Sequence, residues 1–163
     1  MKGFTPGLFD RLMDTHAATA SSATVSRLSI EDLKDTVARD LEALLNTRTV
    51  IPEELLKLYP ECGRSIISYG LNDFAGLSLS SADDRAYICA CLEKAIGRHE
   101  PRLQNVKASL EVQEGSINRL NFAITALLVL NSAEEPVNFD AILQPSSLHY
   151  SISKARRVAS PGA

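Results

Sequence analysis

The chain has 163 residues, of which 45% are hydrophobic and 23% charged, an ordinary balance for one globular domain with terminal extensions. Its formal net charge of −3 gives no reason to expect a nucleic-acid partner. Three cysteines form no secreted disulfide framework, and no apolar run approaches the roughly 20 residues that cross a bilayer. Charges also interrupt the N-terminus too early for a signal peptide, so we expect a cytoplasmic protein without direct membrane insertion.

The first 28 residues combine a short amphipathic patch with a stretch rich in small residues. Leu8, Phe9 and Leu12 fall on one helical face, and residues 16–24 are small or polar without periodicity. This pattern fits a docking segment followed by a flexible linker over residues 1–28. A patch that folds back on its own domain fits the pattern equally well.

Helical periodicity begins at Ser29, where Asp32 completes a capping-box pattern. The apolar positions that follow at helical spacing are Ile30, Leu33, Val37, Leu41, Leu44 and Leu45. Residues 46–48 end this helix, and Pro52 suits the first position of a short helix that ends at Leu58.

Glycines interrupt residues 59–78, where we expect one or two helical turns over 65–69 and a stop at Gly70. A third helix follows Ser81, with Asp84 as a second capping-box acid. Its predicted buried face consists of Arg85, Ile88, Leu92, Ala95 and Ile96. The helix should end before His99, because Pro101 excludes helical backbone at the residue before it.

Beyond Pro101 the apolar period changes to two, which is typical of strands. We predict strands over 106–112, 120–130 and 137–143, a fourth near 148–152, and turns at 114–116 and 131–136. Leu127 and Val129 make the second strand apolar on both faces, which predicts a sheet covered on both sides. Helices followed by a small C-terminal antiparallel sheet give the α+β class, with one domain over 29–153 and a flexible tail over 154–163.

Glu100, at the helix-to-strand corner, is the one candidate for a catalytic acid. A glycosidase needs a second carboxylate about 5 to 9.5 Å away, and no spacing in the sequence identifies one. The alternative is a structural Glu100 held by Arg102 or another arginine. Cys89 and Cys91 point to different sides of one helix, and no phosphate-binding glycine loop is present, so we expect no metal, cofactor or catalytic site.

Five short segments occur in an order that is specific as a set, although each is weak alone: residues 8–12, 39–48, 69–78, 100–103 and 137–140. Together they resemble the phage baseplate-wedge family that includes TssE and carries the label "lysozyme-like". The resemblance covers nearly the whole chain, except for the small-residue stretch near the start and the basic tail.

This resemblance implies a baseplate-wedge lysozyme-like fold and a structural, non-enzymatic subunit of a type VI secretion baseplate at the cytoplasmic face of the inner membrane. The implied partners are the TssF–TssG wedge complex, TssK and the TssB–TssC sheath, whose assembly the protein is expected to help initiate. Docking is expected at Glu100, Pro101 and Arg102, with Leu8, Phe9 and Leu12 as a second partner-binding segment.

Two alternatives accompany this interpretation, a peptidoglycan hydrolase and a generic cytoplasmic adaptor unrelated to secretion. A peptidoglycan hydrolase acting with the secretion machine is the alternative function, although no export signal supports it. A short antiparallel sheet also has edges that can accept a strand from the sheath. Charges such as Lys107 and Glu111 fit an ordinary protected edge as well.

Overall fold

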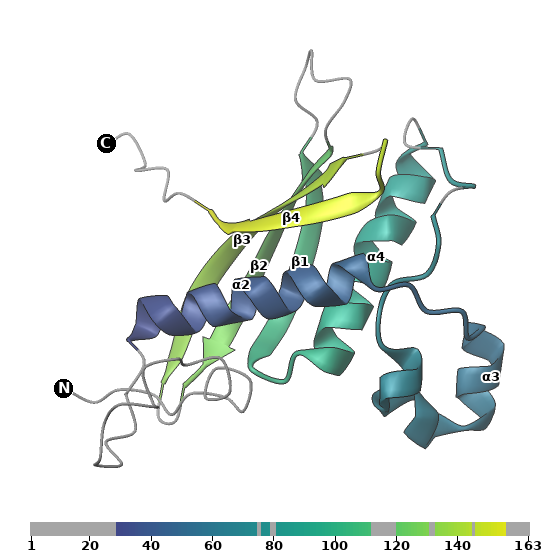
Figure 1. Ribbon diagram of the computed structural model, residues 1–163, viewed down its shortest axis with the longest axis horizontal. Helices are drawn as coiled ribbons and strands as arrows, with labels where there is room; N and C mark the ends of the chain where they lie inside the picture. The colour runs from purple at the N-terminus through teal and green to yellow at the C-terminus, as the bar shows by residue number, and fades with distance from the viewer. Residues whose placement is uncertain are drawn as a thin grey trace, which may run out of the picture.

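Four antiparallel strands in the order β1-β2-β3-β4 form the sheet on which the helices pack (Figure 1). The structure is a computed structural model that describes residues 29–74, 76–78, 81–111, 120–130, 133–144 and 146–155. The elements in chain order are α2 (Ile30–Asn46), α3 (Glu53–Leu58), the 3-10 helices η2 (Pro60–Arg64) and η3 (Ile66–Ser68), α4 (Ala82–His99), β1 (Leu103–Glu111), β2 (Leu120–Val129), β3 (Glu134–Gln144) and β4 (His149–Lys154). The predicted α+β class is confirmed.

The two long helices begin where the capping residues predicted. The Ser29 side chain accepts a hydrogen bond from the Asp32 backbone, and the Asp32 carboxylate accepts one from Ser29, so the capping box at α2 is complete. At α4 the Ser81 cap is present, but the Asp84 carboxylate accepts from the Ser78 backbone instead of from Ser81. The second capping box is therefore only half formed.

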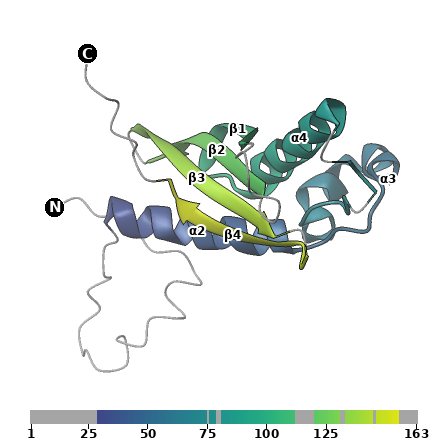
Figure 2. The ribbon, with the colours of Figure 1, turned by 90° about the horizontal axis from the view of Figure 1, so that it is seen from above.

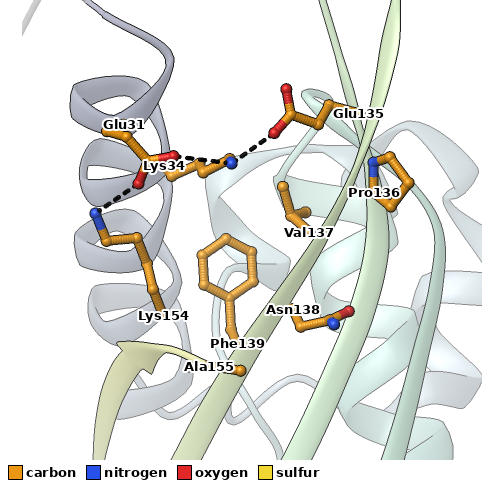
Figure 3. A pocket seen from close by; sticks show the side chains of 9 residues that line it. All are labelled: Glu31, Lys34, Glu135, Pro136, Val137, Asn138, Phe139, Lys154 and Ala155. Atoms are coloured by element: carbon orange, nitrogen blue, oxygen red, sulfur yellow. Dashed lines mark hydrogen bonds and ion pairs between the residues drawn. The ribbon is translucent and has the colours of Figure 1, made fainter. Parts of the chain in front are cut away.

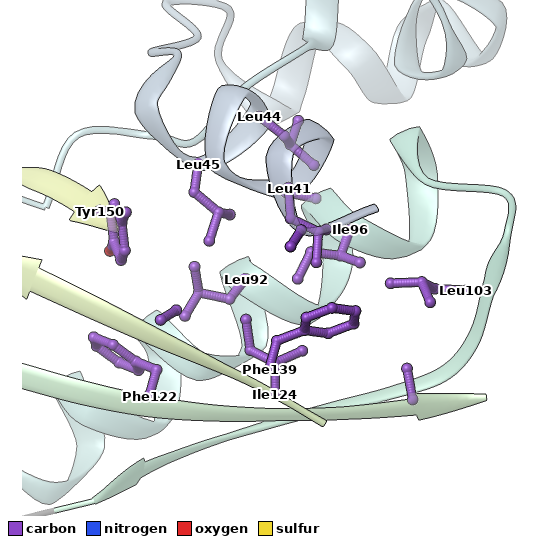
Figure 4. Packing of buried hydrophobic residues seen from close by; sticks show 14 of the residues in the cluster. Leu41, Leu44, Leu45, Leu92, Ile96, Leu103, Phe122, Ile124, Phe139 and Tyr150 are labelled. Carbon is purple, nitrogen blue, oxygen red and sulfur yellow. The ribbon is translucent and has the colours of Figure 1, made fainter. Parts of the chain in front are cut away.

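The core lies between the sheet and the two long helices (Figure 4). Leu41 and Leu45 of α2, with Leu92 and Ile96 of α4, are fully or almost fully buried. The sheet contributes the alternating residues of β2 and β3, namely Phe122, Ile124, Ala126, Leu128, Val137, Phe139, Ala141 and Leu143. Among the described residues the long helices cover only this face. Leu127 and Val129 are half-buried on the other face, and the expectation of a sheet covered on both sides stays a prediction.

Side chains of α2 hydrogen-bond to the outer backbone edge of β4, beside which the helix runs (Figure 2). Asn46 accepts from the Tyr150 N–H at 2.8 Å and donates to the Tyr150 carbonyl at 2.9 Å, and Glu42 accepts from the Ile152 N–H at 2.8 Å. Four residues of helix rise about 6 Å and two residues of strand about 6.7 Å, so such contacts repeat in register. Among the described residues no strand pairs with this edge of β4, and the α2 side chains take the place of one.

Side chains of α4 likewise hydrogen-bond to the outer backbone edge of β1. The Glu93 carboxylate accepts from the Ala108 N–H at 2.9 Å. One helical turn earlier, the Cys89 thiol hydrogen-bonds with the Leu110 backbone, which partly opposes the rise in the thiol pKa that burial causes. Any strand that pairs with these residues must first displace a helix side chain.

A β-bulge near the start of β1 lengthens that strand beyond its predicted limit. Gln104 pairs with Leu127 and Lys107 with Thr125, so three steps along β1 match two along β2. Asn105 takes up the extra residue at φ 52°, a left-handed conformation that asparagine tolerates better than most residues. Leu103 consequently faces the core although its parity differs from that of the inward-facing Val106.

Two further boundaries differ from the sequence prediction. Strand β3 begins at Glu134 and includes Pro136, for which the sequence predicts a turn. The ladder between β3 and β4 reaches only Phe139, so Pro136 lies where its missing N–H costs no hydrogen bond to β4. Lys154, assigned to the tail, is the last residue of β4, whereas Leu148 lies in the preceding turn.

Gly70 stands where α2's C-terminus meets the segment after η3. Its φ is +115°, and a Cβ there would lie 2.6 Å from the Thr47 carbonyl oxygen. That carbonyl accepts from the Leu71 N–H at 2.8 Å, which forms the bridge between Arg48 and Leu71. Both the backbone conformation and the close approach require glycine.

Gly70→Ala should therefore lower the free energy of unfolding by about 1 to 3 kcal/mol, through backbone strain and loss of the bridge. Gly97→Ala is the matched control, because Gly97 lies in α4 and an alanine methyl group there would meet nothing within 4 Å. We expect the control to stabilise the domain by roughly 0.5 to 1 kcal/mol. Urea unfolding measures both, and equal effects would contradict the role assigned to Gly70.

Candidate functional site

The candidate site is the corner at which α4 turns into β1. The helix runs through His99, one residue beyond the predicted limit, because Pro101 restricts only Glu100, the residue before it. Glu100 caps the helix, with its N–H donating to the Ile96 carbonyl at 2.8 Å. Pro101 is exposed at the turn, and β1 starts two residues later at Leu103.

Glu100 is the one carboxylate among the described residues that is buried, with 5% of its surface exposed. Arg102 donates to it from Nε at 2.7 Å and from Nη2 at 2.5 Å, and the Arg102 backbone N–H lies at 3.2 Å. Arg102 Nη2 also donates to Asp40 of α2 at 2.6 Å. Hydrogen bonds with Glu100 are the main reason that the pKa of Arg102 lies above its ordinary value, with Asp40 adding to the effect.

The corner borders an open hollow of about 450 Å³ between α2 and the end of α4. Ala43 and Leu44 form its α2 side, and Tyr69 lies among the other lining residues. Arg102 remains 31% exposed here, and among the described residues no group accepts a hydrogen bond from its Nη1. The hollow thus combines an apolar wall with a guanidinium group whose Nη1 donors have no acceptor among the described residues.

This geometry bears on the hydrolase alternative. A glycosidase holds the sugar between two carboxylates. Among the described residues, Asp40 is the carboxylate that approaches Glu100 at this corner, and the Arg102 guanidinium lies between the two and bonds to both. The guanidinium therefore occupies the space that a substrate would need.

His99 contacts the end of η3 and the residue after it. Its Nε2 lies 3.1 Å from the Ser68 carbonyl oxygen, and its ring meets Tyr69 edge-on at 5.3 Å between centroids. Burial is the main reason that the pKa of His99 lies below its ordinary value, and the charge of Arg98 lowers it further. A neutral imidazole can donate to Ser68 without bringing a charge into this partly buried place.

The structure contains the internal ion pair between Glu100 and Arg102 that was the alternative interpretation, and partner docking at Glu100, Pro101 and Arg102 stays a prediction. Asp40 was missed, although it lies in the segment 39–48 that carried part of the resemblance. Only folding places it beside Arg102, 62 residues away. Leu8, Phe9 and Leu12 lie outside the described residues.

Cys62, Cys89 and Cys91 are free thiols, and burial raises the pKa of Cys89 and of Cys91. Within the described part of the chain, no group of three or more His, Cys, Asp or Glu side chains is placed to hold a metal ion. None of the described helices is both long enough and apolar enough to cross a membrane.

Arg102→Leu should reduce the free energy of unfolding by about 3 kcal/mol, because it leaves the buried Glu100 carboxylate without its cation. Asp40→Asn is the control, since Asp40 is 42% exposed and an asparagine oxygen can still accept from Arg102. That change should cost less than about 1 kcal/mol. Urea unfolding at pH 7 tests the pair, and similar losses for both variants would show that Glu100 is not the group that depends on Arg102.

The free energy of unfolding should also fall as the pH is lowered from 7.5 to 5.5, because His99 binds a proton more weakly in the folded chain. The unfolded chain binds a proton at the ordinary histidine pKa near 6.5, whereas the folded chain binds it only at lower pH. The contribution of His99 to the free energy of unfolding is therefore present above about pH 6.5. Below that pH it is lost by up to about 1.4 kcal/mol per pH unit, until the pKa of His99 in the folded chain is reached. His99→Gln should flatten the decline between pH 7.5 and 5.5. His149→Gln, at an exposed histidine, should leave it unchanged.

The sequence matches the family model described as baseplate wedge protein gp25 over residues 31–133. The matched span runs from the first turn of α2 to the residue before β3 and includes the whole corner. The segments 8–12 and 137–140 lie outside it. No curated protein matches the chain.

The match covers more than half of the 163 residues. The chain therefore belongs to the family of baseplate wedge protein gp25.

Proposed function

We propose that this protein is a wedge subunit of a type VI secretion baseplate that docks on the TssF–TssG complex through the corner at Glu100, Pro101 and Arg102. Membership in the baseplate wedge family supports the coarser statement, a structural role in a phage-tail-like baseplate assembled with other components. The observation that carries the docking site is the Arg102 guanidinium, held by two carboxylates yet still partly exposed beside an open hollow.

The corner suits docking because its charged group is fixed before a partner arrives. Glu100 and Asp40 hold the guanidinium from two directions, so little side-chain entropy remains to be lost on binding. Its remaining donors can pair with backbone carbonyls or a carboxylate of the partner. An apolar partner side chain can fill the hollow beside Ala43 and Leu44. Losing one half of a buried charged contact of this kind typically costs about 2 to 5 kcal/mol.

The remaining partners and the location complete the proposal. TssK and the TssB–TssC sheath are the further partners, and the assembled baseplate lies at the cytoplasmic face of the inner membrane. Help in initiating the sheath remains part of the proposed role. Because Asn46, Glu42 and Glu93 bond to the outer edges of β4 and β1, a sheath strand that pairs there has to displace them.

The hydrolase alternative finds no supporting observation at the corner. Arg102 engages both oxygens of Glu100 and also holds Asp40. We therefore propose that the family's structural role applies here and that Glu100 orients Arg102.

Filling the hollow without touching the ion pairs tests the docking site. Ala43 is exposed on α2 at the hollow, so Ala43→Trp should leave the fold intact and weaken TssF–TssG binding at least about tenfold by steric exclusion. Ala90→Trp is the matched control, because Ala90 is an exposed helical alanine beside β1 in a different hollow. Titration of the purified wedge complex by calorimetry gives both affinities, with circular dichroism melts as the check on folding.

Unchanged affinity for the Ala43 variant would exclude the corner as the docking surface. Equal weakening by both variants would point to a general effect of the added tryptophan and would equally remove the corner from the proposal.

A further inference from the structure

The segment between α2 and α4 carries a concentration of exposed apolar side chains. Of the eight large hydrophobic side chains that are exposed among the described residues, six lie between Val50 and Ile67. Both views of the ribbon place α3, in the middle of this segment, beyond α4 and away from the sheet (Figures 1 and 2). Single exposed apolar residues are normal on a protein surface, whereas their concentration in one region marks an interaction site.

Helix α3 turns most of its apolar side chains outward. Leu58 and the C-cap residue Tyr59 follow Leu55 by three and four residues, which places the three side chains on one face, called here the outward face of α3. All three are exposed, and Leu58 is 70% exposed. Leu56 is the one buried residue of the helix. The outward face of α3 is therefore available to the apolar side of another helix.

Ion pairs with α4 hold α3 in place. Glu53, in the first turn of α3, accepts from Lys94 at 2.5 Å and from Arg98 at 3.0 Å. The buried Leu56 lies on the same side of the helix as Glu53, three residues further along. The outward face is thus presented in a fixed orientation, and a surface fixed in advance loses less entropy when a partner binds.

A hollow of about 300 Å³ lies beside α3 and brings positive charge to this surface. Lys57 of α3, Arg64 of η2 and Arg98 of α4 line it. Glu54 and Glu61 are also exposed in the segment, but they are not among the residues that line the hollow. A carboxylate that enters the hollow would therefore meet cations from three elements.

The charges of this hollow differ from those of the hollow between α2 and β3. There Lys34 of α2 bonds to one carboxylate of its own helix and to one carboxylate of β3 (Figure 3). In the hollow beside α3 the relation is reversed, because the carboxylate of Glu53 is shared by two cations of α4. Lys57 and Arg64 are exposed, so their charges are accessible to a partner. The hollow beside α3 therefore favours an acidic ligand.

We propose that this surface docks an acidic amphipathic helix of a partner protein. Apolar side chains one turn apart on the partner helix pack on the outward face of α3. A carboxylate beside them enters the hollow and bonds to Lys57 and Arg64, where arginine can offer two parallel hydrogen bonds. The two contacts adjoin, because Pro60 lines the hollow and directly follows Tyr59 in the chain.

This surface is distinct from the corner proposed for docking on TssF–TssG. None of the residues that line the hollow beside α3 also lines the hollow at Arg102. The inference therefore goes beyond the proposed function, and its test requires no wedge complex.

Binding of two synthetic helical peptides to the full chain tests the proposal. Both peptides carry leucines along one face, and the positions that flank this face are glutamate in one peptide and lysine in the other. Fluorescence anisotropy should give the glutamate peptide a Kd at least about tenfold lower than that of the lysine peptide, because only its charges complement the hollow. Salt should reduce this difference, since the charges are exposed.

Two pairs of variants locate the binding site. Leu58→Ser should weaken binding of the glutamate peptide at least about tenfold, because it removes the most exposed side chain of the outward face. Leu148→Ser, at an exposed leucine in the turn before β4, is the matched control. Arg64→Glu should abolish the preference for the glutamate peptide. Lys107→Glu makes the same change in net charge on β1 and should preserve that preference.

Equal affinities of the two peptides for the unmodified chain, or no binding of the glutamate peptide, would overturn the proposal. So would equal weakening by the two serine variants or equal loss of preference in the two glutamate variants, since the peptide would then bind elsewhere.

Discussion

The fold depends on one constraint, the alignment of α2 along the outer edge of β4. Asn46 forms two hydrogen bonds with the Tyr150 backbone, and Glu42 bonds to Ile152 two residues on. These contacts join the first described helix to the last strand, 104 residues away at Asn46. Because helix and strand advance by similar distances per contact, the match fixes both the position and the direction of α2.

The proposed docking corner takes its place from that alignment. The middle of α2 carries Asp40 to Arg102, and the start of α2 brings Lys34 to Glu135 of β3. A shift of α2 would therefore disturb the corner at Arg102 and the contact with Glu135 of β3 together. The family's structural role is consistent with a chain whose buried carboxylate serves to orient a cation.

Side chains of the two long helices also protect the edges of the sheet. Exposed strand edges recruit other strands indiscriminately, and natural sheets cover or disrupt such edges. Here Asn46 and Glu42 bond to the outer edge of β4, and Glu93 bonds to the outer edge of β1. Side-chain caps can be displaced without unfolding a helix, so such edges remain available to a partner that supplies a full ladder of hydrogen bonds.

Local sequence determined the helices and strands, because their signals act over a few residues. Ser29 and Asp32 began α2, Pro101 ended α4, and the alternation at Val137 and Phe139 marked β3. The sequence also pointed to Glu100 and Arg102 by adjacency. Tertiary structure alone decided that Asp40 completes their network, that Asn46 replaces a strand, and that Pro136 can sit inside β3 beyond the end of β4. These outcomes depend on contacts between residues far apart in the chain, whose energies no local pattern contains.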